Sequence, residues 1–133
     1  MIEKIDHIGV AVKNLEANVK FYRETLGVPV GEIFTHGAMR GAFVNIGGVE
    51  FELLENNEPN SAIAKHIEKK GEGVQHVAFQ VDHIEKAMET LKGKGLAFID
   101  EKPRSGARDS RIAFMHPKNT YGILMELVEP AKK

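Results

Sequence analysis

The sequence contains no cysteine, and this absence excludes several kinds of chemistry at once. Without a thiol there can be no disulfide framework, no cysteine nucleophile and no thiolate ligand for a zinc ion. Any metal site must therefore use histidine and carboxylate ligands. The chain has 6 histidines and 19 acidic residues from which such a site can be built.

An excess of one charge and long apolar runs are also missing. The 133 residues carry a formal net charge of −1, so the chain lacks the basic field that attracts nucleic acid or anionic membranes. No apolar segment has the length of a signal peptide or a membrane span. We therefore expect a cytoplasmic protein, with neither nucleic acid nor a membrane as partner. A hydrophobic content of 42% suits a single compact domain over residues 1–133.

One pattern occurs twice along the chain. "DHIGVAVKNLE" at residues 6–16 returns, with changes, as "QHVAFQVDHIE" at residues 75–85. In each copy a histidine opens an apolar alternation with a period of two, which is typical of a strand, and a helix start follows. The repeat predicts two supersecondary modules, at about 1–58 and about 73–130, joined by a linker helix at about 60–71.

Helix boundaries can be predicted in both modules. Asn14 is the expected N-cap of the first helix, and Gly27 is its expected left-handed end. In the second copy Asp82 and Glu85 stand three residues apart, as in a capping box. Each first strand is therefore expected to lead directly into a helix.

The alternation along the strands predicts that four ligand-type side chains share the sheet faces turned away from the helices. If the branched residues pack on the helices, His7 and His76 point the other way, and so do Glu52 in "VEFELLE" and Glu126 in "GILMELVE". A lone strand histidine or glutamate is more often solvated, but recurrence at equivalent places favours ligands. Two imidazoles and two carboxylates suit one divalent ion such as zinc, nickel, cobalt or manganese, and leave open positions for substrate.

The stretches "DHIGVAV", "FVNIGGVEFELLE", "GEGVQHVAFQVD" and "RIAFMHPKNTYGILMELVE" resemble the vicinal-oxygen-chelate superfamily, which includes glyoxalases, bleomycin resistance proteins and dioxygenases. Within it they resemble the methylmalonyl-CoA epimerase family, and the "HPK" turn is the most discriminating feature. The resemblance implies an α+β fold in which two βαβββ modules form a glyoxalase-like curved sheet with a metal site in its concavity. It also implies a homodimer and the metal ligands His7, Glu52, His76 and Glu126.

The activity implied by this resemblance is the metal-dependent interconversion of methylmalonyl-CoA stereoisomers. The reaction removes a proton alpha to the thioester carbonyl, through a chelated enolate, so it needs charge stabilisation at the oxygen and a base within reach of the carbon. Glu126 is the first candidate for this base. Glu52, from the other module, is the candidate for the opposite face of the enolate.

Two alternative functions stay open. The same geometry acting on the methylglyoxal–glutathione hemithioacetal would give glyoxalase I (lactoylglutathione lyase) chemistry, with a glutathione thioester in place of an acyl-CoA. The other alternative is a non-catalytic, resistance-type protein that binds a small molecule, although such a protein has no need of four aligned ligands. An oxygenase with two histidines and one carboxylate is disfavoured, because a fourth protein ligand would take the position that oxygen needs.

Further polar residues are candidates for contact with the substrate. A local basic cluster is expected either to meet the phosphates of a CoA tail or to be solvated loop charge. Epimerases of the family often have His-His where this chain has Gln75-His76, and Gly-Gly where it has Tyr121-Gly122. The basic cluster comprises Lys102, Arg104, Arg108, Arg111 and Lys118. The candidate substrate-binding residues are His116, Lys118, Arg104, Arg111, Gln75 and Tyr121.

Overall fold

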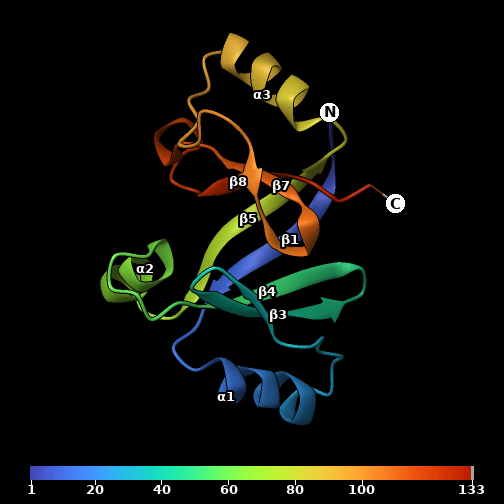
Figure 1. The fold of residues 1–133 in the computed structure, drawn as a ribbon, viewed down its shortest axis with the longest axis vertical. Coiled ribbons are helices and arrows are strands. Elements are labelled where there is room, and N and C mark those ends of the chain that lie inside the picture. Colours follow the sequence, from blue (N-terminus) through green and yellow to red (C-terminus); the bar gives the residue numbers. More distant parts are fainter. Residues whose placement is uncertain (133) are drawn as a thin grey trace. The chain divides into compact units, whose positions relative to one another are not determined.

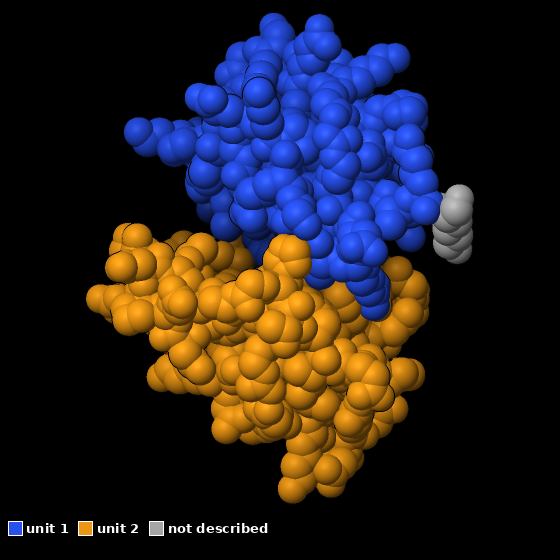
Figure 2. All heavy atoms as spheres, viewed as in Figure 1, with its two compact units in different colours: residues 1–6, 76–133 blue, residues 7–75 orange. Residues whose placement is uncertain are grey.

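The computed structural model describes residues 1–132, which divide into two compact units. Unit 1 comprises residues 1–6 with the chain from His76 onward, and unit 2 comprises residues 7–75 (Figure 2). Both boundaries fall inside histidine-bearing strands, namely β1 (Ile2–Ala11) and β5 (Gly73–Val81). None of the helices in the described part of the chain combines the length and apolar character needed to span a membrane.

Unit 2 contains the first module from His7 onward and the linker helix. Its strands are ordered β2-β3-β4-β1, with β1 parallel to β4 and the other neighbours antiparallel. The linker helix begins after Ser61, whose side chain accepts a hydrogen bond from the amide of Ala64, within the region predicted. The remaining elements are α1 (Leu15–Lys20), which continues as the π-helical η1 (Phe21–Thr25), β2 (Phe34–His36), β3 (Met39–Ile46), β4 (Val49–Glu55) and α2 (Ala62–Lys70).

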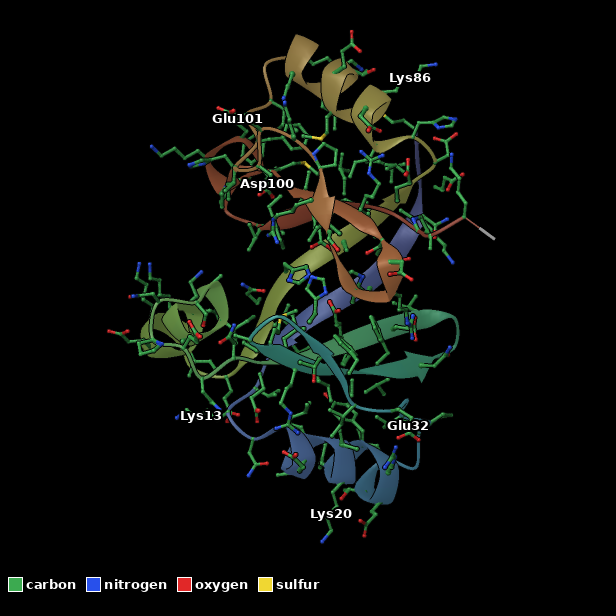
Figure 3. The ribbon with its side chains drawn as sticks, viewed as in Figure 1. Lys13, Lys20, Glu32, Lys86, Asp100 and Glu101 are labelled. Atoms are coloured by element: carbon green, nitrogen blue, oxygen red, sulfur yellow. The ribbon has the colours of Figure 1, made fainter. Side chains whose placement is uncertain are left out.

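The core of unit 2 lies between α1 and the strands β3 and β4 (Figure 1). Val10, Leu15 and Leu53 are buried there, as the alternation of branched residues in β1 and β4 predicts. Lys20 points away from the strands, which leaves its charge in solvent (Figure 3). The histidine and glutamate of this module are therefore directed to the face that α1 does not cover.

Unit 1 repeats the same order of elements. Its strands are ordered β5-β8-β7-β6, with β5 parallel to β8 and the other neighbours antiparallel. Val81, Ile84, Met88 and Leu127 form its core between α3 and the sheet. The elements after β5 are α3 (Ile84–Gly93), β6 (Arg104–Ser105), η2 (Ala107–Asp109), β7 (Arg111–Phe114), η3 (Pro117–Asn119) and β8 (Met125–Glu129). Each unit thus holds one βαβββ module, and the predicted α+β class is confirmed.

The two module helices begin in different ways. The side chain of Asn14 caps α1 by accepting a hydrogen bond from Ala17, as predicted. The capping box predicted for α3 is wrong, because its N-cap is His83 and the N-cap side chain makes no capping hydrogen bond. The first amide of α3, that of Ile84, instead donates to the carboxylate of Glu129 at 3.0 Å. A distant strand therefore replaces the local cap.

Gly41 in β3 lies where a side chain has no room. A Cβ there would be 2.5 Å from Cζ of Phe34 and 2.8 Å from the carbonyl oxygen of Leu53. We expect Gly41→Ala to lower the free energy of unfolding by about 1–3 kcal/mol through overpacking, measured by urea denaturation. Gly93→Ala is the control, because a Cβ at Gly93 would meet no atom within 4 Å. Equal stability of the two variants would contradict this account.

Candidate metal centre

The first candidate ligand pair lies on the uncovered face of unit 2. Nε2 of His7 and Oε1 of Glu52 are 3.2 Å apart, and the two residues are only 5% and 6% exposed. Gly9 is the neighbour of Glu52 across the parallel ladder, so no side chain from that position crowds the carboxylate. Phe43 is the antiparallel partner of Glu52 and presents its ring at a right angle to His7, with the ring centroids 6.3 Å apart.

The second candidate ligand pair lies at the equivalent place in unit 1. Nε2 of His76 and Oε1 of Glu126 are 3.9 Å apart, and both residues are buried. Ala78 and Phe114 flank Glu126 on the neighbouring strands, as Gly9 and Phe43 flank its counterpart. The ring of Phe114 meets His76 at an interplanar angle of 84° with centroids 5.2 Å apart. The repeat therefore extends to the shape of each pair's surroundings.

The donor set of the two pairs fits a divalent metal ion. Each pair offers one imidazole nitrogen and one carboxylate oxygen on a buried face lined by small and aromatic residues. A buried carboxylate has lost hydration, and this loss is costly unless a cation or hydrogen-bond donors replace the water. Nitrogen and oxygen donors of this kind suit zinc and other divalent transition metals.

Four residues with evident roles in these surroundings were not singled out from the sequence. Phe43 and Phe114 make edge-on ring contacts with the histidines, and Glu55 and Glu129 bind the helix N-termini from the strands of Glu52 and Glu126. A signal for both sets existed. Each ligand strand ends with a second glutamate three residues after the first, and each preceding strand has a phenylalanine in the corresponding place.

Three of the candidate substrate residues lie on or beside the elements of the second pair. The guanidinium of Arg104 is 5.5 Å from the ring centroid of Phe114, and its Nε donates to Asp100 at 3.0 Å. The amide of Lys118 donates to Nδ1 of His116 at 3.2 Å, so this turn leaves Nε2 of His116 as the nitrogen that carries the proton in the neutral ring.

The other three candidate substrate-binding residues lie in different surroundings. Arg111 lies on the helix side of its strand, where it pairs with Glu85 and with Glu129, so its charge is engaged on the face opposite the ligand pair. This placement does not support the expected contact with substrate. Gln75 is half-buried in β5, directly before His76, and Tyr121 is fully exposed in the turn before β8 with a positive φ of 56°.

The sequence is similar to those of characterised enzymes over nearly its whole length. An ethylmalonyl-CoA/methylmalonyl-CoA epimerase of Cereibacter sphaeroides is 34% identical over 132 residues, covering 96% of this chain and 98% of that protein. The mitochondrial methylmalonyl-CoA epimerase of Mus musculus is 36% identical over 128 residues, covering 93% of this chain and 71% of that protein.

A solved structure gives the same result. A variant of the Streptomyces coelicolor methylmalonyl-CoA epimerase in complex with 2-nitronate-propionyl-CoA is 37% identical, with a TM-score of 0.93 over 99% of this chain and 100% of that one. The profile of one superfamily matches residues 4–127. This chain therefore belongs to the Glyoxalase/Bleomycin resistance protein/Dioxygenase superfamily.

Proposed function

We propose that this chain is a metal-dependent epimerase that interconverts the stereoisomers of methylmalonyl-CoA. This proposal is supported by the similarity of nearly the whole chain to proteins named as methylmalonyl-CoA epimerases. It is also supported by the buried histidine–glutamate pair in each module. The match to epimerases favours a CoA thioester over a glutathione hemithioacetal as the substrate. The two ligand pairs favour an enzyme over a binding protein, because binding alone requires no metal ligands.

Both pairs are proposed to hold one divalent ion, with His7, Glu52, His76 and Glu126 as its ligands. Each pair by itself has only two donors, whereas catalytic zinc sites in proteins have three protein ligands. The equivalence of the pairs supports a joint site, since each module supplies one imidazole nitrogen donor and one carboxyl oxygen donor. Cobalt, manganese, nickel and zinc are all compatible with this set.

A bound divalent ion would supply Lewis-acid stabilisation of the negative charge that develops on substrate oxygen. The chain itself must supply the groups that move protons and those that exclude water. Phe43 and Phe114 perform the second task, because their rings cover the histidines on the ligand face. Water exclusion strengthens the electrostatic interactions on which the reaction depends.

Glu126 is proposed to take the alpha proton, and Glu52 to act on the other face of the same carbon. In one direction the proton of the C–H bond moves to one carboxylate, and the electron pair of that bond is delocalised onto the thioester oxygen. The other carboxylate, already protonated, then returns a proton to the opposite face, which inverts the centre. The two glutamates exchange roles in the reverse reaction, so a repeated module suits an epimerisation.

Arg104 and Lys118 are proposed to bind anionic groups of the acyl-CoA. Arg104 is held by Asp100 and by the face of Phe114, whose edge contacts His76, so its charge lies one side chain from a proposed ligand. A guanidinium fixed in this way can bind a carboxylate or phosphate with little loss of side-chain entropy. Gln75, His116 and Tyr121 stay as candidates for further contacts.

Hydrogen exchange in deuterated water tests the proposed reaction. Metal-loaded protein is incubated with methylmalonyl-CoA, and separately with methylglyoxal plus glutathione, and deuterium in the product is measured by mass spectrometry. We expect deuterium at the alpha carbon of methylmalonyl-CoA. Turnover of the glutathione adduct alone would replace the epimerase proposal by lactoylglutathione lyase activity, and binding without turnover of either would favour a resistance-type protein.

The homodimer and the cytoplasmic location expected from the sequence stay predictions. Sedimentation of the purified protein at several concentrations measures the first, and fractionation of cells measures the second.

A further inference from the structure

A network of hydrogen bonds and ion pairs lies on the helix side of the sheet and recurs in both modules. In unit 2 the two oxygens of the Glu55 carboxylate are both engaged, one by the amide of Leu15 at 2.8 Å and the other by Nη1 of Arg40 at 3.0 Å. Arg40 also pairs with the exposed Glu16 on the first turn of α1. The side-chain hydrogen bond from Arg40 holds the pKa of Glu16 below its ordinary value.

Unit 1 contains the same four groups at equivalent places. Glu129 accepts from the amide of Ile84 at 3.0 Å and is 3.5 Å from Nη1 of Arg111. Arg111 in turn donates to the exposed Glu85 at 2.9 Å. Each network therefore links a helix N-terminus, a strand glutamate, an arginine of the neighbouring strand and a glutamate in the first helical turn.

Burial makes these carboxylates costly, so a purely structural role explains them poorly. Glu55 and Glu129 are 7% and 8% exposed, and removing a carboxylate from water costs several kcal/mol before its partners compensate. A well-packed apolar residue at such a place is often as stabilising as a buried ion pair. What an apolar residue cannot supply is a directional bond that fixes one strand against a particular amide.

The fixed strands are those that carry the proposed metal ligands. Glu55 follows the last ladder pair of β1 and β4, which joins Ala11 to Leu54, and stands three residues after Glu52. The amide that it binds begins the helix that directly follows β1, the strand of His7. The carboxylate thus ties the end of the strand of Glu52 to the segment that follows the strand of His7.

The same connection exists in unit 1. Glu129 follows the last ladder pair of β5 and β8, between Gln80 and Val128, and stands three residues after Glu126. A slip of one residue along a strand transfers its side chains to the other face of the sheet. A bond at the end of the ladder opposes such a slip, and it also opposes smaller shifts that would separate the histidine from the glutamate.

We propose that Glu55 and Glu129 are positioning residues that set the metal ligands Glu52 and Glu126 against His7 and His76. The proposal rests on the proposed function, because it assumes that these pairs bind a metal ion. The networks act at a distance of three residues along the strand, on the sheet face opposite the ligands. Loss of either one should loosen a ligand pair while leaving its four donor atoms chemically intact.

Titration of Co²⁺ into metal-free protein tests this role, with calorimetry for affinity and visible absorption for the geometry around the ion. We expect Glu55→Met and Glu129→Met, which keep the side-chain volume, to weaken Co²⁺ binding by about 10–100-fold and to alter the spectrum, as loss of a ligand-orienting group does. Glu55→Gln and Glu129→Gln keep an acceptor for the helix amide but lose the ion pair. They should weaken binding less than the methionine variants do, because the bond to the helix amide is kept.

The control variants are Glu24→Gln and Glu89→Gln, which make the same chemical change at exposed positions outside both networks and should bind Co²⁺ like the parent. All titrations are made well below the melting temperature of each variant, so that stability does not enter the affinity. Parent-like affinity in folded methionine variants would overturn the proposal, and if those variants do not fold, parent-like affinity in the glutamine variants would do so. Failure of the parent itself to bind Co²⁺ would instead count against the metal site.

Discussion

The substitution Glu126→Gln is expected to leave metal bound while lowering the rate of proton exchange by about 10²–10⁴-fold, the usual loss on removing a general base. Glutamine keeps a neutral oxygen in place of the carboxylate oxygen that lies 3.9 Å from His76, so a ligand atom remains. It cannot accept a proton at the pH of the reaction. Metal content is measured by mass spectrometry of the purified variant, and exchange by deuterium incorporation into methylmalonyl-CoA.

Glu89→Gln is a matched control for Glu126→Gln, because it makes the same chemical change at an exposed position of α3. It should exchange like the parent. Near-normal exchange in metal-loaded Glu126→Gln would exclude this residue as the base and transfer the role to Glu52. Loss of exchange together with loss of metal would show only that Glu126 is a ligand. The exchange rate of each sample is therefore interpreted together with its metal content.

The placement of both ligand pairs could be anticipated because strand side chains alternate strictly. His7 and Glu52 each stand one residue from a branched residue that packs on α1, and this alone directs them to the uncovered face. The same reasoning holds for the second module. The internal repeat therefore allows the same side-chain alternation to be observed independently in each module. Local alternation thus determines which face a ligand occupies without knowledge of the tertiary fold.

The sequence could not show which charges pair across the sheet. Arg111 belongs by composition to a basic cluster, but its position opposite Glu129 in the antiparallel ladder gives it carboxylate partners on the helix side. The prediction of a capping box for α3 is wrong for the same reason, because the carboxylate that binds the amide of Ile84 lies on β8, far along the chain. Hydrogen bonds that depend on strand register follow from tertiary structure, and local spacing does not encode them.

The two modules divide the proposed chemistry in a way that a single module cannot. In the proposed reaction, one glutamate on each of two equivalent strands would provide a base for each face of a planar intermediate, and the histidine beside each glutamate would provide a neutral donor for the metal ion. The repeat therefore supplies matched groups on two scaffolds of the same fold. The positioning networks extend this symmetry, because each ligand strand has its own buried carboxylate at the helix N-terminus.

Removal of the metal ion is expected to abolish most of the proton exchange. Lewis-acid stabilisation of the developing negative charge contributes several kcal/mol, and each 1.36 kcal/mol is a factor of ten in rate. Treatment with a chelator should therefore lower exchange by roughly 10²–10⁴-fold, and addition of Co²⁺, Mn²⁺, Ni²⁺ or Zn²⁺ after the chelator is removed should restore it to differing extents. The order of restoration identifies the ions that support the reaction.

His76→Ala tests whether that ion depends on the proposed ligands. The substitution removes an imidazole nitrogen from a buried pair, so we expect weaker metal binding and, at limiting metal, a rate close to that of the chelated parent. His66→Ala on α2 is the control for loss of a histidine outside both pairs, and it should respond to chelator and to added metal like the parent. Full exchange by the chelated parent would contradict the role given to the ion and leave the two carboxylates to perform the reaction alone. Full metal affinity in His76→Ala would instead remove this histidine from the ligand set, because a lost nitrogen donor that costs no affinity was not bound to the ion.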